Sequence, residues 1–286
     1  MTFQEMLSQV YATLTEAGIE EAQIEAEVLV RSAANISREN LYAELNSAFP
    51  TEAEEIIKKM LERRLKREPL AYILNVREFY GMELYVDERV LIPRPETEQL
   101  VEDVIDFACS DMGFLSGEIL RIADIGTGSG AIAVAVAANV RQSTVTAVDI
   151  STDALEVASI NCEGHKLEAR IELLHGDLLA PVKGPIDLVV ANLTYVTESE
   201  WESLQPEITK FEPKHALVAA DGGLALMKRL LQEIAVRQPQ PRGVILEFGA
   251  GQMEAVLKLA QQILPKAKTE IHKDLGEIQR SIVIRL

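Results

Sequence analysis

Apolar side chains in the first seventy residues recur at helical spacing, every third or fourth position. One such set comprises Phe3, Met6, Leu7, Val10, Tyr11 and Leu14, and a second comprises Ile24, Val28, Leu29 and Ala33. Each set places an apolar stripe along one side of a helix. A third helix is expected from Thr51 to Arg67, opened by a capping box of Thr51 and Glu54. Its expected inward-facing residues are Ile56, Ile57, Met60 and Leu61. We therefore expect a helical bundle over residues 1–72.

The pattern changes after Pro69, where apolar and polar residues begin to alternate. Residues 73–93 are expected to form a β-hairpin that turns near Gly81 and links two domains. Beyond it, residues 94–286 alternate between strand and helix patterns. The strands are expected near residues 120–124, 145–149, 170–175, 186–191 and 243–248. Such alternation is typical of a parallel sheet with helices on both faces, and the final strand, near Ile284, is expected to return antiparallel.

Composition and charge argue against several classes of protein, including nucleic-acid-binding and membrane proteins. The 286 residues include 28 basic and 45 acidic ones, a formal net charge of −17 at pH 7. A molecule so acidic repels polyanions, so no direct nucleic-acid partner is expected. The longest apolar run, residues 131–138, is far shorter than a membrane span, and the first residues lack a signal-peptide pattern. Cys109 and Cys162 have no disulfide or metal spacing. We expect a cytoplasmic protein with no membrane partner and no metal.

The clearest ligand signal is a strand that runs into a glycine loop and then a helix. Residues 122–130 read IADIGTGSG. The loop residues are Gly126, Thr127, Gly128, Ser129 and Gly130. Glycines let the backbone approach a ligand closely, and the following helix offers free N–H groups. Asp149 ends the next strand, where it is expected to accept hydrogen bonds from two ribose hydroxyls.

Two classes of cofactor fit this arrangement. The dinucleotide fingerprint needs G-x-G-x-x-G, whereas this loop reads G-x-G-x-G and is preceded by Asp124. An acid beside the loop suits a positively charged ligand and is a poor neighbour for a pyrophosphate. We therefore expect S-adenosylmethionine, with S-adenosylhomocysteine as product, rather than a nicotinamide or flavin dinucleotide.

Two further strand ends are expected to face the same ligand. Asp177 and Leu178 follow the third strand, where the carboxylate can accept from an adenine amino group and the Leu178 N–H can donate to a ring nitrogen. Asn192 ends the fourth strand, beside the glycine loop, and ligands of open α/β sheets bind beyond the carboxyl ends of strands. Taken alone, Asp177 and Asn192 also fit ordinary turns.

Several motifs along the chain together resemble one family. Residues 91–98 (LIPRPETE), the glycine loop and Asn192-x-x-Tyr195 look like those of the HemK/PrmC-type protein-(glutamine-N5) methyltransferases, which modify peptide chain release factors. The similarity covers nearly the whole chain and includes residues 67–72, 211–213 and 272–275 and Arg280. The resemblance implies a Rossmann-like class I S-adenosylmethionine-dependent methyltransferase fold. It also implies a seven-stranded, mostly parallel sheet and an N-terminal helical bundle that recognises the substrate.

The resemblance further implies roles for the residues after the fourth strand. A glutamine amide nitrogen is a weak nucleophile because its lone pair is delocalised into the carbonyl. By resemblance, the Asn192 oxygen and the backbone carbonyl of Leu193 hold its two N–H groups, and the Tyr195 ring packs on the amide plane. Asn192, which also faces the cofactor, and Tyr195 are thus the expected catalytic residues. Leu193 and Thr194 complete the expected substrate-binding loop, but they replace two prolines of the family motif, so we expect a less rigid loop.

The expected partner is a class-1 release factor, methylated by a monomeric enzyme on the glutamine of its Gly-Gly-Gln motif. One alternative is a related glutamine methyltransferase that acts on a ribosomal protein, whose family lacks the Pro-Glu-Thr-Glu sequence of residues 95–98. Another is a cofactor-binding interaction protein whose activity weakened when the two prolines were lost. Amino-methylating enzymes of DNA adenine share the strand-end motif, but this acidic chain has no evident DNA-binding domain.

Overall fold

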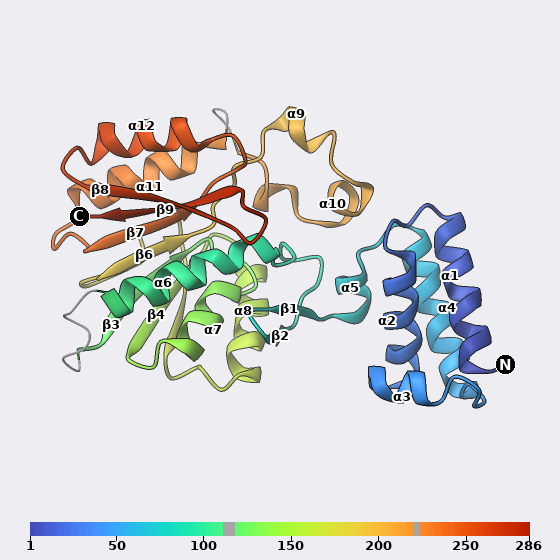
Figure 1. Ribbon diagram of the computed structural model, residues 1–286. Helices are drawn as coiled ribbons and strands as arrows, with labels where there is room; N and C mark the ends of the chain where they lie inside the picture. The colour runs from blue at the N-terminus through green and yellow to red at the C-terminus, as the bar shows by residue number, and fades with distance from the viewer. Residues whose placement is uncertain (111–117, 220–222) are drawn as a thin grey trace. The chain divides into compact units, whose positions relative to one another are not determined.

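The computed structural model describes residues 1–110, 118–219 and 223–286, which form two compact units. The first unit contains Met1–Asn75 and Pro206–Phe211, and the second contains Val76–Gln205 and Glu212–Leu286. The first is helical, and the second carries the large sheet (Figure 1). The chain therefore leaves the first unit after Asn75 and returns to it for one short helix.

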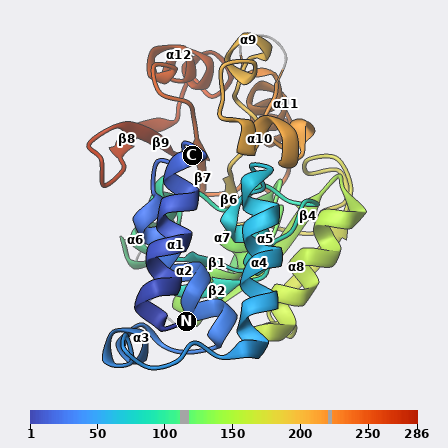
Figure 2. The ribbon, with the colours of Figure 1, turned by 90° about the vertical axis from the view of Figure 1, so that its right-hand side faces the viewer.

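The helical unit is a bundle in which α1, α2 and α4 run side by side (Figures 1 and 2). Its helices are α1 (Phe3–Glu16), α2 (Ala22–Ala34), α3 (Arg38–Ala43), α4 (Thr51–Leu65), α5 (Leu70–Leu74) and α10 (Pro206–Phe211). The helical spacing correctly predicts much of its core, because Phe3, Val10, Leu14 and Leu29 are buried. A helix turns by about 100° per residue, so residues three or four apart share one face.

The prediction is wrong for three residues that were expected to face inward. Tyr11, Ile24 and Ile56 are 46%, 62% and 45% exposed. Tyr11 and Ile56 each adjoin a buried apolar residue, Val10 and Ile57 respectively. Adjacent residues point about 100° apart on a helix, so a face centred on Val10 or Ile57 turns the neighbouring residue toward solvent.

The capping box expected at Thr51 is also wrong. Helix α4 begins at Thr51 itself, Pro50 is its N-cap, and no side chain caps it. Pro50 takes an extended conformation there (φ −61°, ψ 130°), so Thr51 is already inside the first turn. Capping boxes open two other described helices: α1, where Thr2 and Glu5 satisfy each other's backbone N–H groups, and α9 (Glu198–Trp201), where Thr197 and Glu200 do the same.

A buried ion-pair network joins three helices of this unit. Arg64 of α4 is 5% exposed and donates to Glu25 of α2 at 2.6 Å and to Glu207 of α10 at 3.0 Å. Arg67 donates to the second oxygen of Glu207, also at 3.0 Å. Buried charges are tolerated when they are paired in this way. The network explains why α10, distant in sequence, belongs to the helical unit.

The second unit is built on a seven-stranded sheet with strand order β5-β4-β3-β6-β7-β9-β8. Its strands are β3 (Leu120–Ile125), β4 (Ser143–Asp149), β5 (Ile171–His175), β6 (Leu188–Ala191), β7 (Gly243–Glu247), β8 (Lys268–Lys273) and β9 (Gln279–Arg285). Strands β3 to β7 pair in parallel, whereas β9 runs antiparallel to β7 and β8. The expected mixed sheet with an antiparallel end is confirmed.

Helices cover both faces of this sheet (Figure 1). One face carries α6 (Glu98–Ser110), α7 (Ala131–Asn139) and α8 (Thr152–Gly164), and the other carries α11 (Ala225–Val236) and α12 (Met253–Ile263). Two apolar cores result, one on each face. The remaining helical segments are η1 (Pro95–Thr97), α9 (Glu198–Trp201) and η3 (Lys214–Ala216). No helix among the described residues has both the length and the apolar character to span a membrane.

A two-stranded hairpin precedes the sheet in the chain. Strands β1 (Arg77–Phe79) and β2 (Met82–Leu84) pair antiparallel and turn at Tyr80 and Gly81, as expected. Phe79 and Leu84 are each 1% exposed and pack in the core on the α6 side of the sheet. The hairpin is therefore part of the second unit.

Candidate active site

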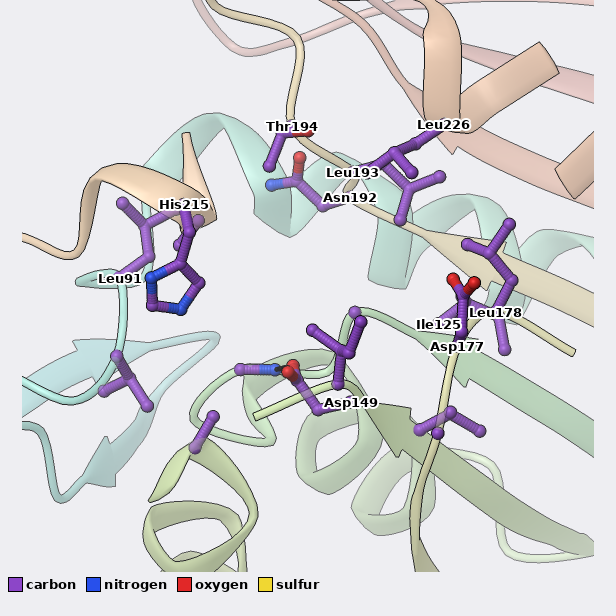
Figure 3. Close-up of a pocket in the computed structure, with 18 of the residues that line it drawn as sticks. Leu91, Ile125, Asp149, Asp177, Leu178, Asn192, Leu193, Thr194, His215 and Leu226 are labelled. Carbon is purple, nitrogen blue, oxygen red and sulfur yellow. Dashed lines mark hydrogen bonds between the residues drawn. The ribbon is translucent and has the colours of Figure 1, made fainter. Parts of the chain in front are cut away.

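A cavity of about 230 Å³ opens where β3, β4, β5 and β6 end (Figure 3). Strand β3 lies between β4 and β6, so the chain order reverses here, which is where open α/β sheets bind ligands. Predicted site residues that line the cavity are Gly126, Gly128, Asp149, Asp177, Leu178, Asn192, Leu193 and Thr194. Predicted residues outside its wall are Asp124, Thr127, Ser129, Gly130 and Tyr195.

The glycine loop connects β3 to α7 with left-handed backbone conformations. Gly126 has φ +75°, and a Cβ there would lie 3.3 Å from the Leu193 side chain. Gly130 has φ +79°, and a Cβ there would lie 3.2 Å from Ala158 of α8. Glycine is favoured at both positions because it adopts positive φ without steric cost. The first glycine thus lets the loop approach Leu193, and the second lets α7 pack on α8.

Asp124 lies beneath the loop rather than on the cavity wall. It is 0% exposed, and its Oδ2 accepts a hydrogen bond from the Thr127 hydroxyl at 2.6 Å. Its Oδ1 has no hydrogen-bond partner among the described residues. Burial raises the pKa of Asp124 to about 7. Asp124 therefore holds the loop from below through Thr127.

Asp149 ties the ends of two neighbouring strands together. Its Oδ2 accepts from the Gly128 N–H at 2.8 Å, and its Oδ1 accepts from the Ser151 N–H at 2.9 Å. Each carboxylate oxygen has a second lone pair, so both can accept a further hydrogen bond from a ligand in the cavity. Figure 3 shows this side chain across the cavity from Asn192.

The third strand end supplies Asp177 and Leu178. Asp177 is exposed and forms an ion pair with Arg229 of α11, and both residues line the cavity. Leu178 is 6% exposed and adopts φ +48°, a conformation that is uncommon for a leucine. The arginine partner was not expected from the sequence.

Asn192 and Tyr195 stand on the loop after β6, but they face different neighbours. The Asn192 side chain lines the cavity, and its Nδ2 donates to the Thr97 hydroxyl at 3.0 Å. The Tyr195 hydroxyl instead donates to Glu247 of β7 at 2.9 Å. Burial and the neighbouring Glu247 carboxylate raise the pKa of Tyr195 above its ordinary value.

Leu193 and Thr194 lie between them. Leu193 is 9% exposed and packs with the core under α11 and α12. The Thr194 hydroxyl is buried and has no hydrogen-bond partner among the described residues. The Leu193 side chain is therefore well packed, whereas the hydroxyl of Thr194 is buried without a hydrogen bond.

The cavity contains residues that the sequence did not indicate. They include Arg89, Val90, Leu91, Ile150, His215, Ala216, Leu226 and Arg229. Ile150 carried a usable signal, because it is an apolar residue that directly follows Asp149 at the end of a predicted strand. His215 and Leu226 reach the cavity from distant segments, so no local pattern identifies them (Figure 3). Among the described residues, no group of His, Cys, Asp and Glu side chains is arranged to hold a metal ion.

Comparisons with known proteins cover both units. Residues 5–74 match the family model of the PrmC N-terminal domain, and residues 96–204 match that of the methyltransferase small domain. The chain is similar to the release factor glutamine methyltransferases of Bacillus cereus, with 33% identity over 99% of this chain and 98% of the relative, and of Bacillus subtilis, with 36% identity over 98% and 96%.

Solved structures agree with the fold of the second unit. The catalytic domain of human METTL16 in complex with the MAT2A 3′UTR hairpin 1 aligns with a TM-score of 0.58 at 19% identity, over 79% of this chain and 80% of that one. The N-terminal domain of human METTL16 in complex with SAH aligns with a TM-score of 0.52 at 20% identity, over 80% and 83%. At such identities the likeness establishes a methyltransferase-type fold alone.

Proposed function

This chain belongs to the family of release factor glutamine methyltransferases, and we propose that it methylates the N5 amide nitrogen of a glutamine in a class-1 peptide chain release factor. The methyl donor is S-adenosylmethionine, and the glutamine is that of the Gly-Gly-Gln motif. The observation that carries this proposal is the place of Asn192, which lines the same cavity as the glycine loop in a chain similar to these enzymes over its full length.

The residues around the cavity fit S-adenosylmethionine. Asp149 retains lone pairs that can accept from two ribose hydroxyls, and Asp177 and the Leu178 N–H, which also line the cavity, would bind the adenine ring. Asp124 lies behind the glycine loop, and a cationic ligand in the cavity would favour its ionised form, which suits this cofactor. When bound, this cofactor supplies an electrophilic methyl group on a positively charged sulfur.

The chain's own residues act by holding the glutamine amide. The Asn192 oxygen and the Leu193 carbonyl each accept one N–H of the amide, which turns the nitrogen lone pair toward the methyl donor. Fixing the reacting atoms in this way lowers the barrier through orientation and preorganised dipoles. Tyr195 lies outside the cavity wall and supports the loop through its hydrogen bond to Glu247.

We further propose a role for the helical unit, an oligomeric state and a cellular compartment for the enzyme. The helical unit holds the release factor, which its match to the PrmC N-terminal domain supports. The enzyme works as a monomer in the cytoplasm. Cys109 and Cys162 are free thiols, which suits a reducing compartment.

The test is a methyl-transfer assay with labelled S-adenosylmethionine. We expect label on a class-1 release factor, no label when its Gly-Gly-Gln glutamine is replaced by alanine, and no label on ribosomal proteins. Asn192→Ala should slow single-turnover transfer at least about 100-fold, the usual cost of removing a preorganised polar group, while cofactor affinity changes less than about threefold. Label on a ribosomal protein alone, or a rate within tenfold of the parent for Asn192→Ala, would contradict the proposal.

A further inference from the structure

Helix α11 contacts the segment that follows β5 at two points, one on each side of Leu178. Arg229 donates to Asp177 Oδ2 at 2.5 Å, and Glu233 Oε2 accepts the Leu179 N–H at 3.1 Å. The two α11 residues are four positions apart, so they share one face of the helix. Arg229 also lines the cavity. This face of α11 therefore fixes how the segment meets the cavity.

The segment presents one acceptor and one donor that the protein itself does not use. Asp177 Oδ1 and the Leu178 N–H have no hydrogen-bond partner among the described residues, and both residues line the cavity. Figure 3 shows Asp177 and Leu178 at the same edge of the cavity. An adenine ring offers the matching pair, because its 6-amino group donates and its N1 accepts. Hypoxanthine offers the opposite pair, because its O6 accepts and its N1–H donates.

The conformation of this segment needs support from its neighbours. Leu178 has φ +48°, which is uncommon for a leucine and persists only where surrounding groups enforce it. The Asp177 side chain is 47% exposed, so without a partner it would sample several rotamers. A single ion pair at such exposure contributes little to stability. The contacts from α11 therefore matter more for the orientation of the segment than for the stability of the fold.

We propose that Arg229 and Glu233 are positioning residues that set the base specificity of the cofactor site. The proposal rests on the proposed function, in which S-adenosylmethionine occupies the cavity. Arg229 holds one oxygen of Asp177 and thereby turns the other toward the 6-amino group. Glu233 holds the peptide that follows Leu178, which keeps the Leu178 N–H directed at N1. Ordering both groups before the ligand arrives favours a 6-aminopurine and rejects a 6-oxopurine, which would set acceptor against acceptor and donor against donor.

The test compares two ligands of equal charge by titration calorimetry. They are S-adenosylhomocysteine and S-inosylhomocysteine, in which hypoxanthine replaces adenine. The parent should prefer the adenine ligand at least about 100-fold. Arg229→Met removes the ion pair and Glu233→Ala removes the acceptor, so each should reduce this preference at least about tenfold. Arg229→Lys keeps a charged donor and Glu233→Gln keeps an acceptor, so both should retain the preference to within about threefold.

A matched control removes a charge from the same helix. Lys228 is exposed on α11 and lies outside the described cavity wall, so Lys228→Met should leave both affinities unchanged. Melting curves confirm that each variant is folded. An unchanged preference in Arg229→Met or in Glu233→Ala would overturn the role of that residue. An equal loss of affinity for both ligands would also overturn it, because structural support alone weakens both.

Exchange of the Leu179 amide, followed by NMR, tests the second contact without a ligand. Glu233→Ala should speed this exchange at least about tenfold, whereas Glu233→Gln should not. Equal exchange in Glu233→Ala and the parent would show that Glu233 does not hold this peptide. If the parent binds neither ligand, the proposed function fails and this proposal fails with it. If the parent binds S-adenosylhomocysteine and methylates a release factor but does not distinguish the two ligands, the positioning role alone is wrong.

Discussion

At the scale of single residues, the candidate site depends on carboxylates that hold backbone in place. Asp149 accepts from the N–H groups of Gly128 and Ser151, and Asp124 accepts from the Thr127 hydroxyl. These acids fix the glycine loop before any ligand arrives. Preorganisation of this kind reduces the ordering cost of binding.

The first prediction concerns Asp149. Replacing it with asparagine removes the charge and one acceptor oxygen, so affinity for S-adenosylmethionine should fall by roughly 1.5–3 kcal/mol, the usual worth of a hydrogen bond to a charged group. Titration calorimetry measures the change. Asp153→Asn, at an exposed position on α8, serves as the control and should leave affinity unchanged. An unaltered affinity in Asp149→Asn would show that this residue does not hold the ribose.

The second prediction concerns Thr194, whose buried hydroxyl lacks a partner. Thr194→Pro removes that hydroxyl and restricts φ, so it should stabilise the protein by about 0.4–1 kcal/mol and raise the methylation rate. Thr194→Val removes the hydroxyl without restricting φ, so it should lack the part of the stability gain that comes from the unfolded chain and should leave the rate unchanged. Melting curves and single-turnover assays make the comparison. A proline variant that is slower and less stable would mean that this loop has a conformation proline cannot adopt.

At the scale of secondary structure elements, a buried acid joins a helix to two strands. Asp103 of α6 is 2% exposed and accepts from Ser281 of β9 and from His272 of β8. Burial disfavours the charged imidazole, but the hydrogen bond and charge of Asp103 outweigh it and raise the pKa of His272 above its ordinary value. The antiparallel end of the sheet is thus tied to α6 by an interaction that depends on protonation.

The third prediction follows from the sign of that shift. A pKa raised on folding adds stability that is fully present below the unfolded pKa of about 6.5 and is lost as pH rises through the folded value. His272→Gln should therefore cost about 1.5–3 kcal/mol in unfolding free energy at pH 5.5 and clearly less at pH 9. Urea unfolding at both values tests this, with exposed His175→Gln as the control. An equal cost at both values would contradict the charged pair.

Elements were more predictable from the sequence than the contacts between them. Local spacing was sufficient for α1, α2 and α4 and for the strands before the glycine loop and Asn192, because burial on one face imposes a period. Glu247 was not identified, because an acid ending an apolar strand has no local signal for the side chain it meets. His215 and Arg229 reach the cavity only through tertiary folding. The exposed Tyr11 and Ile56 show that spacing alone places the edge of an apolar stripe poorly.

At the scale of the whole molecule, the cavity and the candidate catalytic residues all lie in the second unit, and the helical unit contributes none of the described cavity wall. Ligand binding should therefore stabilise the two units unequally. Anything that binds only the folded form adds stability by mass action.

The fourth prediction measures that inequality. S-adenosylmethionine at 100 times its Kd should add about 2.7 kcal/mol, which corresponds to a rise in Tm of roughly 5–11 °C for a unit of this size. Hydrogen exchange should slow at the amides of Gly128 and Leu178 and stay unchanged in α1, α2 and α4. Nicotinamide adenine dinucleotide at the same concentration is the control and should have no effect. Protection confined to the helical unit would place the ligand elsewhere.

The return of the chain to the helical unit limits how this protein can be recombined with its relatives. The helical unit consists of two separate segments of the chain, residues 1–75 and 206–211. Glu207 in the second segment forms ion pairs with Arg64 and Arg67 in the first. A chimaera that exchanges only the first piece would combine arginines from one parent with a helix from another. Functional hybrids should therefore require both pieces from a single parent, and natural substitutions in the two pieces should change together.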